Sequence, residues 1–270
     1  MASVVSATSN PLYFFYDCEG SGGSSEEAAI IEVAAVLYTK NLSFTERKAA
    51  NLSEEHFTSL CYTDICPQHF VSVMTEITQE QLDEAPRLDT VLEKLFTWIK
   101  KTLSRVKDQT KKQHFPVLVA HKGKDYDFPL LINEIKRIGS PVLDQFRELN
   151  LHFADTLVLC ERLRSNNDPI LRGSKSISVN GLHKLFFPDE EYKEHRALED
   201  AKALCKVFTD SPLAGLVSEL RLQTTENLLS FPEPKTELVT KSQRKLRRQA
   251  LRMHPYTRLP KKARSSILKL

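Results

Sequence analysis

The sequence predicts an α/β fold in which a mixed sheet of about five strands is flanked by helices. Strand-like segments follow one another near the N-terminus, whereas later strand-like segments alternate with segments of helical periodicity. An apolar content of 41% over 270 residues is enough to bury the core of one ordinary domain, with residues left over at an end. We therefore expect an N-terminal extension at 1–10, one domain at 11–230 and a tail at 231–270.

The first two strands are expected to form a hairpin. Residues 12–16 are an aromatic run that leads into an acid, and residues 28–38 are rich in β-branched side chains. The glycine- and serine-rich stretch at 20–25 between them is typical of a turn. A third strand is predicted at 57–65, and Pro67 ends the pattern.

Helical patterns begin after the third strand. Thr78 fits the N-cap of a short helix, with Gln81 as its capping-box partner. Apolar residues spaced along 87–106 predict a long amphipathic helix, and 107–113 has the composition of a polar loop. The apolar run at 115–120 predicts a buried strand.

The second half is expected to alternate helices with strands. A helix at 128–138 should end at Gly139, and 153–155 should be the end of a short strand. Three further helices are predicted, at 156–163, 179–187 and 196–208.

The formal charge of +3 hides an asymmetry along the chain. From Lys241 to the end there are eleven Lys or Arg residues and no acid, which leaves 27 basic against 35 acidic residues in the remainder. A mildly acidic domain with a basic tail is expected. The tail either contacts phosphates, acts as a nuclear address or is a solvated extension, and the sequence does not choose between these.

The cysteines and the apolar stretches of the chain indicate where in the cell the protein is expected. The five cysteines are odd in number and none forms a C-x-x-C pair, which argues against a zinc site and favours reduced thiols. No signal peptide is recognisable near the N-terminus, and the longest apolar stretch, 28–38, is too short to cross a bilayer. A soluble intracellular protein of the nucleus or cytoplasm, without a membrane partner, is expected.

Acidic side chains follow two of the predicted strands. Asp17 and Glu19 lie two residues apart at the end of the first strand, so the alternation of a strand places both carboxylates on one face. Asp125 and Asp127 follow the strand at 115–120, at a strand-to-helix junction of the kind where open α/β sheets bind ligands. Either motif alone has a simpler explanation, as a chance pair of acids or as a helix cap.

A histidine and an acid mark the start of the last predicted helix. His195 and Asp200 are five residues apart, so they do not share a helical face. His195 is expected on the loop before the helix and Asp200 in its first turns, which would let both reach one site. A surface histidine beside an exposed acid is the simpler explanation of this motif alone.

Together the three motifs resemble, in order and context, the exonuclease motifs of the DEDDh or DnaQ-like family of 3′-to-5′ exonucleases. The family's second motif runs H-N-G-x-x-F-D, which selects Asp127 rather than Asp125 as the acid. The general layout also resembles that of the three-prime repair exonucleases. The resemblance covers about residues 12–210 and includes 30–36, 77–86, 119–123, 155–157 and 195–201.

The resemblance implies an RNase H-like fold and a site for two divalent ions, Mg²⁺ or Mn²⁺, held by Asp17, Glu19, Asp127 and Asp200. Hard oxygen ligands suit these ions, and four converging carboxylates would repel one another without cations. His195 is implied as the general base for the attacking water, a role suited to a group with an ordinary pKa of about 6.5. The implied reaction hydrolyses phosphodiester bonds at the 3′ ends of DNA or RNA and releases nucleoside monophosphates.

Two loops depart from the family pattern. The family's first motif continues D-x-E-T-T-G-L, whereas Gly20 and Gly23 stand here in place of the first Thr and the Leu. Lys122 stands where the second motif usually has Asn. From the resemblance we expect Gly20, Ser21, Lys122 and Lys124 to contact nucleic acid, although exposed lysines at a turn are commonly only solvated.

A second class of function stays open. The exonuclease fold can serve as a catalytically idle module that binds nucleic acid or protein, as in the exonuclease-like region of the promyelocytic leukaemia protein, which has lost the acids. The presence of all five motif residues in this chain favours catalysis, because a scaffold has no physical need for converging carboxylates. The sequence does not distinguish DNA from RNA, and it leaves the oligomeric state open.

Overall fold

The sheet has six strands in the order β3-β2-β1-β4-β5-β6. The computed structural model describes residues 10–40, 42, 43, 46, 48, 50 and 55–230. Strands β1, β4 and β5 are parallel to one another, whereas β2, β3 and β6 join by antiparallel pairing, so the predicted mixed α/β sheet is confirmed. The strands are β1 Asn10–Gly20, β2 Ile30–Leu37, β3 His56–Leu60, β4 His114–Ala120, β5 His152–Asp155 and β6 Leu222–Thr224.

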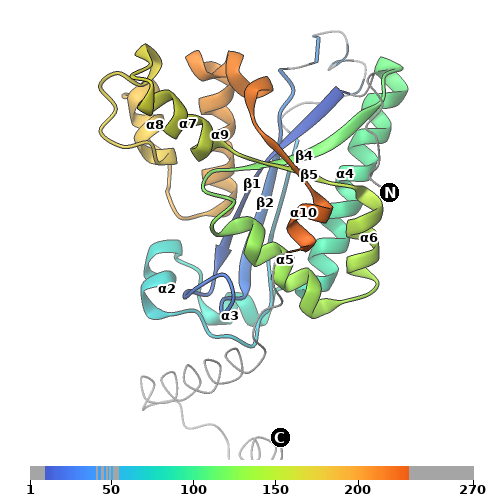
Figure 1. Cartoon of the computed structure of the whole chain (residues 1–270). Coiled ribbons are helices and arrows are strands. Elements are labelled where there is room, and N and C mark those ends of the chain that lie inside the picture. The colour runs from blue at the N-terminus through green and yellow to red at the C-terminus, as the bar shows by residue number, and fades with distance from the viewer. Residues whose placement is uncertain are drawn as a thin grey trace, which may run out of the picture.

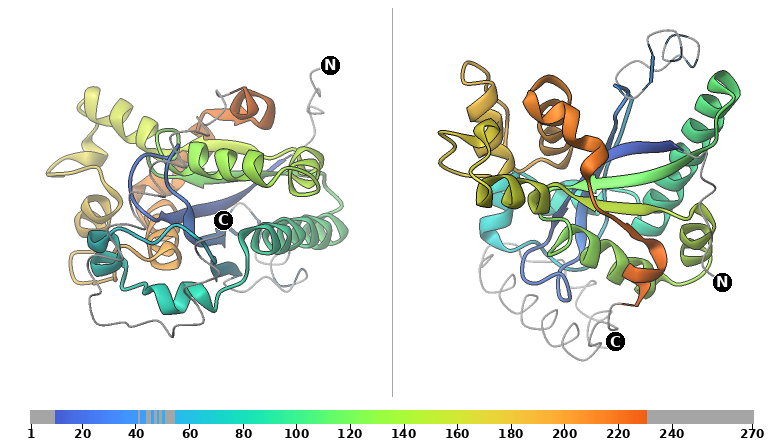
Figure 2. Two further views of the ribbon diagram at one scale, coloured as in Figure 1. Left: turned by 90° about the horizontal axis from the view of Figure 1, so that it is seen from below. Right: turned by 45° about the horizontal axis from the view of Figure 1, so that its top comes forward.

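Helices cover both faces of this sheet. Figures 1 and 2 show α7, α8 and α9 on one side of the strands and α4 and α6 on the other. The helices are α2 His69–Thr75, α3 Gln79–Asp83, α4 Leu88–Thr110, α5 Asp127–Ile138, α6 Val142–Leu149, α7 Thr156–Ser165, α8 Val179–Phe186, α9 Ala197–Asp210 and α10 Thr225–Leu229, with 3-10 turns η1 Pro169–Leu171 and η2 Pro212–Glu219.

Strand β1 is the centre of the molecule because alternate side chains feed two separate cores. Leu12, Phe14 and Tyr16 are fully buried against α4, α5 and α6. Tyr13 and Phe15 point the other way and pack with α7, α8 and α9. The aromatic run is therefore core strand, as its alternation predicts, and the next residues of β1 inherit the same two faces.

The carboxyl ends of the parallel strands place the acidic motif segments at one edge of the sheet. β1 runs parallel to β4, and β4 to β5, so their carboxyl ends at Gly20, Ala120 and Asp155 lie together. β2 is antiparallel to β1 and begins at this edge, with Glu32 opposite Glu19. The segments that carry the first two motifs thus leave the sheet at one place, as is usual for ligand sites of open α/β sheets.

Local signals in the sequence account for several element ends. Thr78 caps α3 in a capping box with Gln81, as predicted. The polar stretch 107–113 was expected to be a loop, but α4 continues to Thr110, because the residues after Val106 hold no helix breaker. The helix ends where Lys111 adopts φ 57°, in the left-handed region.

Besides the two 3-10 turns, four short helices and strands in the described residues carry no sequence expectation of their own. These are α2, α6, β6 and α10, and each is eight residues or shorter. Such lengths are too brief for a periodic pattern to stand out. No helix in the described part of the chain is both long and apolar enough to cross a membrane. The expected basic tail and nearly all of the expected N-terminal extension lie outside the described residues.

Candidate active site

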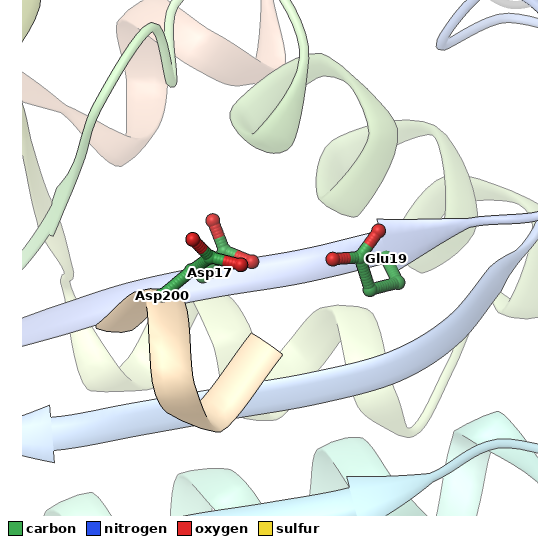
Figure 3. A group of neighbouring side chains, drawn as sticks. All are labelled: Asp17, Glu19 and Asp200. Carbon is green, nitrogen blue, oxygen red and sulfur yellow. The ribbon is translucent and has the colours of Figure 1, made fainter. Parts of the chain in front are cut away.

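Three carboxylates meet on the α9 side of β1. Asp17 and Glu19 continue the face of Tyr13 and Phe15, because they are two and four residues further along the strand than Phe15. Figure 3 shows both rising from β1 on the side where Asp200 approaches from the first turns of α9. One oxygen from each of the three lies within 4.8 Å of the others.

Asp200 is oriented by the backbone at the start of its own helix. The Arg196 amide donates a hydrogen bond to Asp200 Oδ2 over 3.2 Å, so the carboxylate folds back over the N-terminus of α9. A helix N-terminus carries partial positive charge, which favours a negative group there. Asp200 therefore lies at a fixed place opposite Asp17.

Asp127 lies beside this group without joining it. It is the first residue of α5, and its Oδ1 accepts from the Cys18 amide over 3.2 Å and from the Cys18 thiol over 3.6 Å. The β1–β4 pairing ends at Phe15, so Asp127 takes up the backbone donor that β1 offers beyond that point. The sequence predicts four acids in one site, and the structure gathers three with the fourth as their neighbour.

Burial raises the pKa of each acid in the group, and repulsion among the acids adds to it for Asp17 and Glu19. Burial is the largest cause for Glu19, whose pKa rises from 4.5 to about 7, and Asp200 and Glu32 add repulsion. Burial also raises the pKa of Asp127 to about 7, against the hydrogen bonds from Cys18. The pKa of Asp17 is raised well above its ordinary value, by burial first and then by Asp127 and Asp200. Carboxyls in this state favour a bound proton or a bound cation.

His195 lies just before the helix that carries Asp200. It lies on the loop directly before Arg196, the N-cap of α9, as the motif predicts, and it is exposed. Its φ of 64° lies in the left-handed region, which is uncommon for a residue with a side chain. Its charge acts on Asp200, where it lowers the pKa of that carboxyl. The structure thus brings His195 within electrostatic reach of Asp200.

Of the residues expected to contact nucleic acid, Ser21 is placed differently. It is fully buried, its Oγ accepts from the Ala29 amide over 3.0 Å, and its carbonyl accepts from the Gln68 amide over 2.8 Å. Its side chain therefore closes the loop and is not available to a ligand. Gly22, at φ 99°, packs against the Gln68 side chain, where a Cβ would come within 3.0 Å.

Lys122 and Lys124 are exposed, and the loop that carries them is fixed from below. Their amides donate to the two oxygens of Asp155, over 2.9 and 3.0 Å. Asp155 also accepts from the Leu157 amide, so it caps α7 and holds the second-motif loop as well. Lys122 has φ 63°, a conformation that Asn, the usual residue of the family motif, adopts more readily.

The presence of glycine at position 20 is explained by the close approach of the Tyr126 side chain. Its φ is not in the left-handed region, unlike those of Gly22 and Gly23. A Cβ at Gly20 would collide with the hydroxyl of Tyr126 and lie 3.3 Å from Leu130 Cδ2. Tyr126 stands at the Phe position of the family motif, so its hydroxyl occupies the room that Gly20 leaves.

One residue that contacts the site was missed by the sequence patterns. Glu32 is 3% exposed and pairs with Arg196, and the only signal was a charge inside an otherwise apolar strand. His183 is 3% exposed, and its ring contacts the rings of Phe187 and Tyr192. His121 is bonded to Thr156 Oγ1 over 2.9 Å and burial lowers its pKa to about 4, so it supports the fold.

The acids present fit a divalent cation. Asp17, Glu19 and Asp200 offer hard oxygen donors in one place, and their raised pKa values reflect the lack of positive charge among them. Arg196 lowers the pKa of Glu19, but burial and the charges of Asp200, Glu32 and Asp127 outweigh this effect. The site can therefore hold a metal with these three residues and Asp127 beside them.

We expect the metal-free protein to lose stability as the pH rises. A carboxyl with a higher pKa in the folded state keeps its proton longer there, so the free energy of unfolding falls as the pH rises from 4.5 through about 7 for Glu19. Melting curves in EDTA between pH 5 and pH 8 measure this. Glu19→Gln should reduce the fall, and Mg²⁺ or Mn²⁺ should restore stability at pH 8. An unchanged pH dependence in Glu19→Gln would contradict the expectation.

Known proteins with related sequences are exonucleases. Residues 14–208 match the model of the RNase_T family, described as Exonuclease. A segment of 98 residues is 34% identical to three prime repair exonuclease 2 of Mus musculus, covering 36% of this chain and 40% of that protein. A segment of 106 residues is 32% identical to the chloroplastic/mitochondrial exonuclease DPD1 of Arabidopsis thaliana, covering 39% of this chain and 31% of that protein. The matched segments thus span less than half of either relative.

Solved structures show the same fold at low identity. E. coli exonuclease I in complex with a dA16 oligonucleotide aligns with a TM-score of 0.55 and 14% identity, over 76% of this chain and 42% of that chain. Cell-death related nuclease 4 aligns with a TM-score of 0.50 and 12% identity, over 79% of this chain and 66% of that chain. The family match spans every motif residue from Asp17 to Asp200. The chain belongs to the DnaQ-like 3′-to-5′ exonuclease family.

Proposed function

We propose that this protein is a metal-dependent exonuclease that removes nucleoside monophosphates from the 3′ end of a nucleic-acid strand. The observation that carries the proposal is the meeting of Asp17, Glu19 and Asp200 within 4.8 Å, with Asp127 and His195 beside them. These five positions are the ones that the family motifs assign to the chemistry. Converging, partly buried acids are costly to a fold, so their presence argues for a function that uses their charge.

The residues of the chain divide the work of phosphodiester hydrolysis. Asp17, Glu19, Asp127 and Asp200 would hold two ions, Mg²⁺ or Mn²⁺, which supply positive charge to the developing phosphoryl transition state. His195, exposed on the loop before α9, accepts a proton from the attacking water. The water oxygen bonds to phosphorus, the bond from phosphorus to O3′ breaks, and the shortened strand keeps a 3′ hydroxyl.

Substrate contacts are proposed for the rim of the site. Lys122 and Lys124 are exposed on a loop fixed by Asp155, so their ammonium groups can attract the phosphate backbone. The structural neighbour exonuclease I is described bound to DNA oligonucleotides, which supports a nucleic-acid substrate for this chain.

The test is digestion of 5′-labelled single-stranded DNA, duplex DNA and RNA with Mg²⁺, Mn²⁺ or EDTA. We expect a ladder that shrinks from the 3′ end, requires the metal and is lost in Asp200→Asn. Asp108→Asn is the matched control, because Asp108 is an exposed acid on α4, on the other side of the sheet from α9. Folded wild-type protein that cleaves none of these substrates would favour the idle binding module instead.

A further inference from the structure

The buried acid of β2 ties that strand to the start of α9. Glu32 is 3% exposed and stands opposite Glu19 in the β1–β2 pairing. Its Oε1 accepts from Arg196 Nη2 over 2.7 Å, and its Oε2 accepts from Arg196 Nε over 3.1 Å and from the Ala197 amide over 2.9 Å. Both carboxylate oxygens are therefore bonded to the two residues that follow His195.

The bonds to Glu32 restrain a strained part of the backbone. His195 has φ 64°, a strained conformation for a residue with a side chain, which persists only where the surroundings enforce it. Arg196 directly follows His195, and its amide also orients Asp200. On the other side of His195, Glu194 accepts from Asn180 and Lys193 pairs with Glu76. The backbone is thus held before and after the histidine.

Stability alone does not explain why a charged pair does this work. Replacing a buried ion pair by apolar residues of similar volume is often neutral or stabilising. Glu32 also lies close enough to Glu19 to raise the pKa of that acid, which makes the site less favourable for Glu19's own charge. The contribution of the pair is a fixed geometry, because the planar guanidinium and the carboxylate hold Arg196 in one orientation.

We propose that Glu32 and Arg196 form a positioning clamp that sets where His195 and Asp200 stand relative to Asp17 and Glu19. The clamp rests on the proposed function, because it serves the same site. It links the site through the protein itself: β2 pairs with the strand that carries two of the acids, and the clamp joins β2 to the segment that carries the third acid and the histidine. A small displacement of this segment would separate the catalytic groups without unfolding the domain.

The test compares wild type with the double variant Glu32→Leu/Arg196→Met. This variant keeps side chains of similar volume but removes the two-point contact that orients Arg196. We expect the double variant to stay folded by melting curve and to bind Mn²⁺ about 10-fold more weakly in calorimetric titration. Turnover of an oligonucleotide should fall about 100-fold in kcat, with little change in KM, as for misplaced catalytic groups. Arg196→Lys is the second variant, because it keeps the charge without the two-point contact.

The matched control is Glu55→Leu/Arg105→Met. Arg105 and Glu55 also form a two-point pair, with Nη1 2.6 Å from Oε1, but they join α4 to the chain before β3. This control should keep wild-type Mn²⁺ affinity and turnover. A folded Glu32→Leu/Arg196→Met protein with wild-type Mn²⁺ affinity and turnover would overturn the clamp. If the double variant does not fold, wild-type values in Arg196→Lys would overturn it.

The clamp and the proposed function can fail separately. If wild type binds Mn²⁺ but degrades no substrate, the exonuclease proposal fails, and the Mn²⁺ affinities of the variants still decide on the clamp. If wild type is active and the clamp variants match it, the function stands and the clamp is overturned.

Discussion

Asp17→Asn will abolish nucleotide release and at the same time make the metal-free protein more stable. Asp17 is partly buried on β1 among Glu19, Asp127 and Asp200, and desolvation with their repulsion raises its pKa well above the ordinary value. An amide removes the charge but keeps the shape, so the cost of confining a carboxylate there disappears. The same change removes a ligand, and the loss of about 4 kcal/mol of transition-state stabilisation corresponds to about 1000-fold in rate.

The two effects are measured on one preparation. Activity on a 5′-labelled oligonucleotide with Mg²⁺ gives the rate, and melting in EDTA at pH 8 gives the stability. A gain of 1 kcal/mol should appear as a rise of at least about 2 °C. Added Mg²⁺ should stabilise wild type much more than the variant. Asp108→Asn should change neither quantity, and an active or a destabilised Asp17→Asn protein would contradict the assignment.

Gly20→Thr will destabilise the protein, and Tyr126→Phe will rescue it. The threonine found in the family motif would bring a Cβ into the Tyr126 hydroxyl and to 3.3 Å from Leu130 Cδ2. Overpacking of this kind costs about 1–3 kcal/mol. Removal of the hydroxyl leaves the ring carbon Cζ at 3.3 Å, a tight contact that a small shift relieves. The two positions therefore should not be independent.

A double-mutant cycle measures this dependence. Urea unfolding of wild type, Gly20→Thr, Tyr126→Phe and the double variant gives the coupling energy. We expect the double variant to regain most of what Gly20→Thr loses. Gly215→Thr is the control, because a Cβ there meets no atom within 4 Å and Tyr126→Phe should not affect its cost. Additive effects of Gly20→Thr and Tyr126→Phe would show that the departure from the family motif has another cause.

Much of the fold follows from local patterns in the sequence. Alternation along 12–19 places Asp17 and Glu19 on one face, and the strand geometry of β1 realises it. The Thr78 capping box, the Asp155 cap and the turn at Gly139 follow from the bonding of single residues to nearby backbone. These features depend on neighbours a few residues away, so a sequence states them directly. The end of α4 was missed because polar side chains at 107–110 are as compatible with an exposed helix as with a loop.

The candidate site divides in the same way. By itself the sequence determined the types of group, their order and the elements that carry them, because these depend on periodicity and on motif spacing. Only the tertiary structure decided that Asp127 bonds to Cys18, that Ser21 is buried, that Gly20 yields space to Tyr126 and that Glu32 holds Arg196. Cys18 and Asp127 are 109 positions apart in the chain, Glu32 and Arg196 are 164 apart, and Ser21 is covered by residues that pack over its loop. Such contacts are set by how strands and helices pack together, and no local pattern records them.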